Sequence, residues 1–205
     1  PKLAERLRMI RNHAEAVVSD AKVEDITNMI GFNLRLTELS AAIGSAQLEE
    51  VSEHVKRRCD LAAGLSEGVS GIPGLIAPTV REGCTHSYYN WMLRFRSEEM
   101  GVNRDIFVEA LVAEGVPCFK GYVKPLYRLP VFQKRIAIGS EGFPFTLSNI
   151  DYSSVSCSVA DRLYEKEFIG IECCAWDSSN NLSENIVAAF EKVIKNIDEL
   201  RAYSR

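Results

Sequence analysis

The chain changes from a polar loop to a helix of small residues within one segment, GFNLRLTELSAAIGSAQLEEV (Gly31–Val51). Asn33 and Arg35 are separated by one residue, so in an extended loop their side chains project from the same side. An amide donor beside a guanidinium suits a phosphate or a carboxylate. The alternative is a loop in which Asn33 caps its own turn and Arg35 is solvated.

The helix pattern that follows begins at Thr37, a good N-cap residue, and continues to about Leu65 with apolar residues at helical spacing. Its first half carries AAIGSA (41–46), whose small side chains let another backbone approach closely. Its second half is charged. We therefore expect the first half to be buried and the second to be solvated.

Upstream of this segment, residues 2–18 have the apolar spacing of a helix, and residues 19–36 are expected to form a loop. The chain begins at Pro1, without a methionine and inside this helical pattern. We therefore expect the chain to be a cut piece of a longer protein.

Downstream, GVSGIPG (68–74) is a turn-rich break and the best internal boundary. The expected elements after it are a strand over HSYYNWMLRF (86–95), a helix over Asp105–Glu114 capped by Asn103 and ended by Gly115, a helix over 156–168, a strand over GIECCAW (170–176) and a helix from Ser183 to about Tyr203. The segment 117–133 is rich in aromatic residues and prolines and is expected to be irregular.

This order of elements indicates the α+β class, with a small, mostly antiparallel sheet covered on one side by helices. We expect two parts. Residues 1–70 form a helical arm, and residues 71–205 form the small α+β domain.

The composition is that of an ordinary globular protein, with 46% hydrophobic and 25% charged residues. A net charge of −4 gives no overall attraction to nucleic acid, and no apolar run is long enough to span a membrane. The six cysteines show neither a CxxC pair nor the spacing of a zinc site. We expect reduced, mostly buried thiols in a cytoplasmic protein, with Cys173 and Cys174 packed in a strand, and no metal site.

Six blocks of the sequence resemble, in order, segments of the DegT/StrS family of sugar aminotransferases. Gly31–Val51 resembles the family segment G-x-N-x-R-x-[ST]-E-[LI]-x-A-A-x-G-x-x-Q-L. The other blocks are LAERLRMIRNHAEA, HSYYNWMLRF, VNRDIFVEALVAEGVP, GYVKPLYRLPVF and CSVADRLYEKEFIGIE. Family members are fold-type-I enzymes that use pyridoxal 5′-phosphate (PLP). The resemblance implies that this chain is their small C-terminal domain with the long interdomain helix before it.

The resemblance also assigns roles to the polar loop. In the family, the asparagine of this segment reaches the PLP phosphate of the neighbouring subunit, which implies that Asn33 binds the cofactor. Arg35 is implied to line the same shared site, and the helix after it to pack at the core of a homodimer.

The lysine that forms an imine with PLP lies, in the family, upstream of the LAERLRMIRNH helix and therefore before Pro1. The aspartate and the aromatic ring that hold the pyridine ring are also expected there. The resemblance thus implies no catalytic residue in this chain, no transamination by this chain alone and no PLP bound to it.

The sequence departs from the family pattern at three places. Tyr88-Tyr89 stands where members often have tyrosine–histidine, Ala14 follows Asn12-His13 where glycine is usual, and Cys157–Asp161 lacks the usual proline. The first change bears on the substrate more than on the reaction.

Four residues are candidates for substrate binding: His86, Tyr88, Tyr122 and Tyr127. His86 begins an aromatic strand, and Tyr122 and Tyr127 flank Lys124 in a loop where rings could stack on a base or a sugar. The alternative for each is packing or capping within the domain.

These observations favour a PLP-dependent aminotransferase that converts a keto-sugar nucleotide to an amino sugar, with glutamate or glutamine as donor. The GYVKPLY block points to surface-polysaccharide or aminosugar biosynthesis. Two alternatives remain: a stand-alone dimerisation or ligand-binding module, and a PLP protein with altered chemistry.

Overall fold

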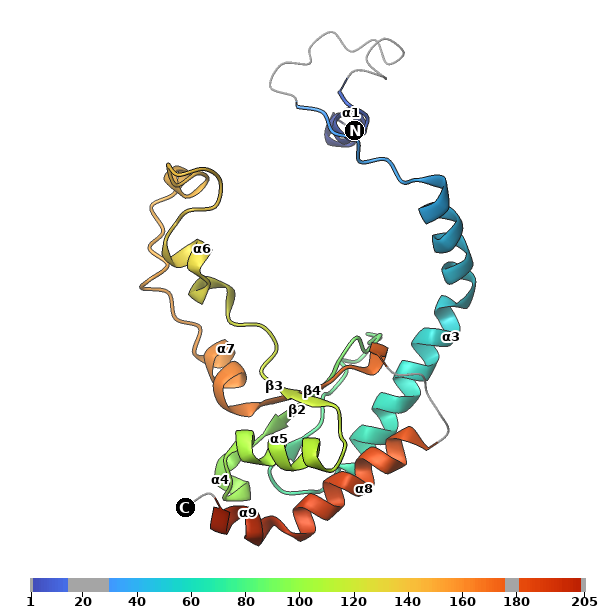
Figure 1. The fold of residues 1–205 in the computed structure, drawn as a ribbon, viewed down its shortest axis with the longest axis vertical. Coiled ribbons are helices and arrows are strands. Elements are labelled where there is room, and N and C mark those ends of the chain that lie inside the picture. The colour runs from blue at the N-terminus through green and yellow to red at the C-terminus, as the bar shows by residue number, and fades with distance from the viewer. Residues whose placement is uncertain (1, 15–29, 176–180, 204–205) are drawn as a thin grey trace. The chain divides into compact units, whose positions relative to one another are not determined.

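The computed structural model describes residues 2–14, 30–175 and 181–203 (Figure 1). The chain divides into two compact units, Pro1–Ser52 and Glu53–Arg205. The division falls inside the longest helix, α3 (Glu38–Gly68). The partition into residues 1–70 and 71–205 stays a prediction.

In the first unit, helix α1 (Lys2–Arg11) is shorter than the helix predicted over residues 2–18. It ends because the chain turns at His13 and Ala14, whose φ angles of 62° and 59° lie in the left-handed region. Residues 15–18 of the predicted helix and 19–29 of the predicted loop lie outside the described residues. Residues 30–36 are loop, as predicted.

Helix α3 begins after Thr37, whose hydroxyl oxygen accepts a hydrogen bond from the backbone N–H of Ser40 at 3.2 Å, so the N-cap is confirmed. The expected burial is wrong. Leu61, Ala62 and Leu65 in the second half are buried, whereas the residues of 42–46 are exposed in the described chain. The second half is buried because its apolar side chains, spaced three and four residues apart, face the sheet of the second unit.

The second unit contains a four-stranded antiparallel sheet, which confirms the predicted fold class. Its strands are β1 (Leu75–Ile76), β2 (Trp91–Phe95), β3 (Cys118–Lys120) and β4 (Phe168–Ile171), in the order β1-β2-β4-β3. Trp91 pairs with Ile171 and Leu93 with Ile169, so the inward side chains of the two central strands lie opposite each other.

The remaining elements of this unit are short helices and turns. They are α4 (Ser97–Met100), α5 (Arg104–Ala113), η1 (Leu126–Arg128), α6 (Pro130–Gln133), η2 (Phe145–Leu147), α7 (Ser158–Arg162), η3 (Leu163–Glu167), η4 (Cys173–Ala175), α8 (Leu182–Lys195) and α9 (Ile197–Tyr203). The helix predicted over 156–168 is thus a short α-helix continued by a π-helical turn, η3.

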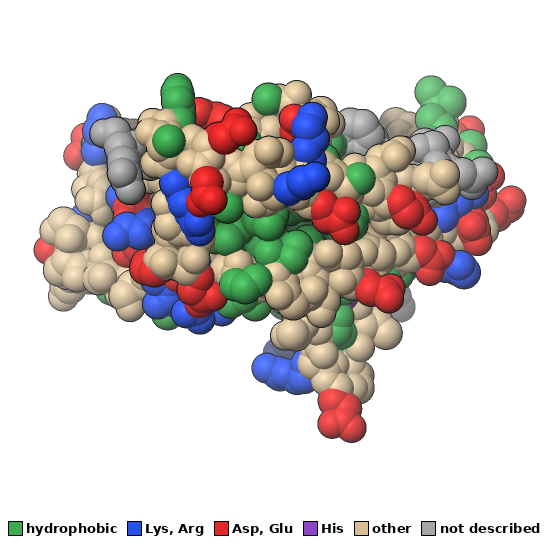
Figure 2. All heavy atoms as spheres, turned by 90° about the horizontal axis from the view of Figure 1, so that it is seen from below, with side chains coloured by type: hydrophobic (Ala, Val, Ile, Leu, Met, Phe, Trp, Pro, Cys, Tyr) green, Lys and Arg blue, Asp and Glu red, His purple; other side chains and the backbone are tan. Residues whose placement is uncertain are grey.

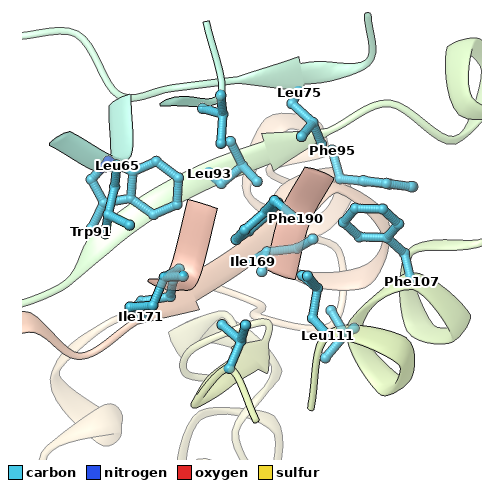
Figure 3. Close-up of a cluster of buried hydrophobic side chains, with 14 of the residues drawn as sticks. Leu65, Leu75, Trp91, Leu93, Phe95, Phe107, Leu111, Ile169, Ile171 and Phe190 are labelled. Carbon is cyan, nitrogen blue, oxygen red and sulfur yellow. The ribbon is translucent and has the colours of Figure 1, made fainter. Parts of the chain in front are cut away.

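The core lies between the sheet and the helices on one of its faces (Figure 3). Trp91, Leu93 and Phe95, alternate residues of β2, are each 0% exposed. They pack with buried residues of α3, α5 and α8. The Trp91 indole N–H donates to the Ser66 hydroxyl of α3 at 2.9 Å, so the one polar atom of the ring has a partner.

Helix α5 confirms both predicted ends. The Asn103 side chain accepts a hydrogen bond from the backbone N–H of Asp105 at 2.8 Å, and Gly115 has φ of 88° just after the helix. The helix predicted to run from Ser183 to Tyr203 is interrupted at Asn196. The side chain of Asn196 donates to the Lys192 carbonyl at 2.8 Å and caps α8 there.

The strands differ more from the prediction. The strand predicted over residues 86–95 begins only at Trp91, because Tyr88 has φ of 44° and its N–H donates to Nδ1 of His86. The strand predicted over 170–176 is shifted to Phe168–Ile171, and Cys173 and Cys174 lie in the turn η4. Residue 176 lies outside the described residues. Strands β1 and β3 were not predicted; β3 lies in the segment expected to be irregular.

Between β3 and α7, residues 121–157 form a long excursion that we call the aromatic arm (Figure 1). The rings of Phe132, Phe145 and Tyr152 meet pairwise with centroids 5.2–5.8 Å apart. Arg135 donates to the carbonyl oxygens of Phe145 and Ser148 at 2.8 and 2.6 Å. The arm therefore has a small core of its own.

Replacement of Leu93 by alanine tests the core. Because Leu93 is fully buried between sheet and helices, we expect Leu93→Ala to lower the free energy of unfolding by about 2–5 kcal/mol. Val112→Ala on the exposed side of α5 is the control and should change it by less than about 0.5 kcal/mol. Urea unfolding measures both. Equal effects would contradict this placement of the core.

Candidate functional site

The polar loop of the first unit is held against the end of α1 by backbone hydrogen bonds. Phe32 N–H donates to the Ile10 carbonyl at 2.8 Å, His13 N–H to the Phe32 carbonyl at 3.0 Å, and Leu34 N–H to the Arg11 carbonyl at 3.0 Å. Any side chain at Gly31 would overlap the backbone of His13 and Ala14. Glycine is thus required for this close approach, which fixes the backbone on both sides of Asn33.

The structure brings Asn33 and Arg35 together. The Arg35 Nε–H donates to Oδ1 of Asn33 at 3.0 Å, and both side chains are exposed. This bond uses the amide oxygen as acceptor and leaves the Asn33 amide N–H groups and the Arg35 terminal nitrogens without a partner among the described residues. The pair therefore presents donors and one positive charge on a fixed backbone, which suits an anion such as a phosphate.

His86 and Tyr88 form a second local pair. Their rings stack with centroids 4.1 Å apart, and the His86 carbonyl accepts a hydrogen bond from the Cys59 thiol at 3.2 Å. Burial against the core, with the nearby thiols of Cys59 and Cys173, raises the pKa of the Tyr88 phenol. The two residues form a turn just before β2. Their role in substrate binding stays a prediction.

Tyr122 and Tyr127 both lie in the aromatic arm but in different surroundings. Tyr122 is 52% exposed, with its ring 6.0 Å from that of Phe119. Tyr127 donates its hydroxyl proton to Asp161 and accepts a hydrogen bond from the backbone N–H of Cys157 at 3.3 Å. The hydrogen bond to the Asp161 carboxylate raises the pKa of the Tyr127 phenol.

A cavity of about 370 Å³ opens beside Tyr127. It is lined by Lys124, Tyr127, Arg128, Gln133, Tyr152, Ser153, Val155 and Asp161. Its walls combine two cations, a carboxylate, hydroxyl and amide groups and two phenol rings, a chemistry that suits a sugar or a nucleotide. Tyr122 does not line it.

Sequence reasoning did not single out Asp161 or Gln133 as site residues. Asp161 lies in the CSVADR block that carries the family resemblance, and this was the available signal. Gln133 donates to the carbonyl oxygens of Tyr127 and Tyr152 at 2.6 and 3.1 Å, so it joins two segments of the arm that are far apart in the sequence, which no local pattern reveals.

Other chemistry finds little support in residues 2–14, 30–175 and 181–203. There, no three His, Cys, Asp or Glu residues gather as a metal ion would require. None of the described helices has the length and apolarity to cross a membrane. Figure 2 shows basic and acidic side chains interspersed, not a basic patch, on the face that it presents.

The cysteines are free, but the expectation that most are buried is wrong. Cys173 alone is buried; Cys84 and Cys157 are exposed, and the other three are half-buried. Cys84 and Cys157 are exposed because they lie in surface loops outside the helices and strands. Burial raises the pKa of Cys118 and of Cys173 to about 11, which makes both poor nucleophiles.

The fold matches part of solved sugar aminotransferases. A crystal structure of DesI in the presence of its TDP-sugar product superposes with a TM-score of 0.70 at 17% identity, covering 98% of this chain and 45% of that chain. The fold, helices with a small antiparallel sheet, is thus that of part of such enzymes.

Residues 1–167 match the DegT/DnrJ/EryC1/StrS aminotransferase family, and the chain belongs to this family. It is similar to the spore coat polysaccharide biosynthesis protein SpsC of Bacillus subtilis, with 28% identity over 142 residues, 66% of this chain and 36% of SpsC. It is also similar to L-glutamine:2-deoxy-scyllo-inosose aminotransferase of Micromonospora echinospora, with 27% identity over 193 residues, 91% of this chain and 44% of that protein. The chain therefore spans less than half the length of these curated relatives.

Titration of Tyr127 tests the geometry of the arm. Because a neutral hydroxyl donates to Asp161, the Tyr127 phenol should ionise above pH 10, and its hydrogen bond is present below pH 10 and lost as the pH rises through the raised pKa. We expect Asp161→Asn to move the midpoint down toward 10. The midpoint is measured by carbon-13 NMR of protein whose tyrosines are labelled at the ring carbon that bears the hydroxyl, and Tyr127→Phe assigns the signal. The same midpoint with and without the carboxylate would contradict the contact.

Proposed function

We propose that the full protein is a PLP-dependent aminotransferase that converts a keto-sugar nucleotide to an amino sugar, with glutamate or glutamine as amino donor. Membership of the family supports this, as do the aminotransferase and polysaccharide functions named for relatives. Its product would enter a surface polysaccharide or another amino-sugar compound. The observation that carries the proposal is the Asn33–Arg35 pair on its fixed loop.

The pair fits the phosphate of PLP. The phosphate carries two negative charges, and Asn33 and Arg35 offer amide donors and a cation, five and three residues before Glu38, the first residue of α3. When bound, PLP supplies the electron sink and carries the amino group between donor and sugar. The imine-forming lysine would come from the remainder of the protein.

The aromatic arm of this chain would bind the sugar nucleotide. Tyr127 and Tyr152 offer ring faces, and Lys124 offers an exposed cation for a phosphate in the cavity of about 370 Å³. Asp161 orients Tyr127 by accepting a hydrogen bond from its hydroxyl, so the ring is held in place before the substrate arrives. His86, Tyr88 and Tyr122 are further candidates for contact with the sugar.

A homodimer would complete the site. Leu39, Ile43, Leu48 and Val51 are exposed along the first half of α3, with Ala42 and Gly44 between them. Exposed apolar residues interspersed with small residues on this half of α3 support its burial against a second subunit in the full protein. The loop before this helix would then extend Asn33 toward the partner's cofactor.

Substitution of the loop residues tests the phosphate role in the full-length enzyme. Asn33→Ala and Arg35→Ala should each weaken PLP affinity about tenfold or more, because a charge-assisted hydrogen bond to the phosphate is lost. Arg8→Ala, an exposed arginine on α1, is the control and should bind PLP normally. Cofactor fluorescence during dialysis measures retention. Normal affinity and turnover in both loop variants would refute the assignment.

Ala42→Glu tests the dimer. A carboxylate placed on the small-residue face of α3 would be buried without a partner at a subunit contact, so the full-length protein should shift from dimer to monomer. Glu53→Ala, farther along the same helix, is the control. Sedimentation velocity distinguishes the two states. A dimer that persists in Ala42→Glu would show that this face packs within one subunit.

A further inference from the structure

Arg104, the first residue of α5, is a charged side chain that is only 5% exposed. Its Nε and Nη2 donate to one carboxylate oxygen of Asp105 at 3.0 and 2.9 Å. Its Nη1 donates to the carbonyl oxygens of Tyr164 and Phe168 at 2.8 and 3.4 Å. A buried guanidinium is costly unless it is paired, and here each of its three nitrogens has an acceptor.

The Phe168 carbonyl is shared with the first residue of the aromatic arm. Gly121 N–H donates to the same oxygen at 3.2 Å. A Cβ atom at Gly121, where φ is 61°, would lie 3.1 Å from the Tyr164 ring and carbonyl, so the arm leaves the sheet in close contact with η3. The start of the arm and the guanidinium thus meet at one acceptor.

Lys120, the last residue of β3, adds a second link at this place. Its ammonium donates to the other carboxylate oxygen of Asp105 at 2.8 Å. Burial of Asp105 opposes its ionisation, but the hydrogen bonds from Lys120 and Arg104 outweigh this and lower the pKa of the carboxyl. Asp105 therefore stays ionised and joins the strand before the arm to Arg104.

The chain returns from the arm through α7 and the π-helical turn η3. Asp161 and Glu165 on this segment accept hydrogen bonds from the Arg128 guanidinium at 3.1 and 2.6 Å, and Asp161 also accepts a hydrogen bond from the Tyr127 hydroxyl. A displacement of η3 would therefore displace Tyr127 and the cavity beside it. π-Helical turns interrupt the regular ladder and often occur at functional sites.

We propose that Arg104 is a positioning residue that clamps both ends of the aromatic arm and thereby sets the place of Tyr127 and its cavity. An arginine is needed because its planar fork reaches Asp105 and the two carbonyls at once, whereas a lysine has one nitrogen. The inference rests on the proposed function only where it assigns the cavity to a sugar nucleotide. The clamp itself follows from the contacts.

The test compares Arg104→Lys with Arg201→Lys in the full-length enzyme with PLP. Arg201 also donates through Nε and Nη2 to a carbonyl, that of Met100 at 2.9 and 2.7 Å, but it has no contact with the arm among the described residues. Hydrogen–deuterium exchange is followed in peptides from the arm, from η3 and from β2 and α5. Calorimetry measures the affinity for thymidine diphosphate, chosen because the DesI structure holds a TDP-sugar.

We expect Arg104→Lys to raise exchange about threefold or more in the arm and in η3 while β2 and α5 stay protected. The affinity for thymidine diphosphate should fall about three- to tenfold in parallel, and Arg201→Lys should change neither. An unchanged arm would overturn the proposal. Uniform loosening of the domain, or a protein that does not fold, would also overturn it, because the role of Arg104 would then be to stabilise the whole domain and not to position the arm. A wild-type enzyme with a protected arm that binds no thymidine diphosphate would count against this nucleotide in the proposed function and leave the clamp standing.

Discussion

The second unit depends on the burial of one side of β2. Trp91, Leu93 and Phe95 are fully buried in the core (Figure 3). The Trp91 indole N–H donates to Ser66 of α3, and the Phe95 ring lies 4.8 Å from that of Phe107 in α5. Because β2 pairs with both β1 and β4, its register also places these two strands. β4 in turn carries the Phe168 carbonyl, to which the arm is attached. The core thus determines where the aromatic arm leaves the sheet and where it returns to it.

A second constraint is local to the first unit. The backbone of the polar loop passes so close to the end of α1 that only glycine fits at position 31. Ala14 adopts φ of 59° at the same contact, a conformation in which alanine is strained. The loop is therefore held by the backbone hydrogen bonds of Phe32 and Leu34, the residues on either side of Asn33, and not by the bond between Asn33 and Arg35.

Much of the fold could be predicted from the sequence, and the failures have physical causes. The longer helices α3, α5 and α8 were found because their period and caps are local, as with Asn103 and Gly115 around α5. Strands β1 and β3 have two and three residues, too few to show alternation. The strand before Trp91 was overestimated because aromatic residues favour strands, whereas the His86–Tyr88 hydrogen bond turns the chain.

The candidate site was predictable to a smaller extent. Asn33 and Arg35 could be paired from their spacing, and the structure joins them by a hydrogen bond. The prediction for α3 buried the wrong half of the helix. Small residues indicate close packing, but they do not identify the surface against which they pack. Arg104 has no sequence signal, since an arginine at the start of a helix is usually solvated, and the two carbonyl acceptors of its Nη1 lie 60 and 64 residues away along the chain.

The measurement that tests the account most directly is the donor half of the reaction, because it requires no knowledge of the sugar. The full-length protein is loaded with PLP and mixed with nitrogen-15-labelled glutamate or glutamine in a single turnover. The account predicts that the labelled nitrogen moves to the bound cofactor, that an oxo acid appears in equal amount, and that Asn33→Ala retains less of the labelled cofactor. A folded, PLP-loaded protein that transfers no nitrogen from either donor would contradict it and would favour a binding module or a PLP protein with different chemistry.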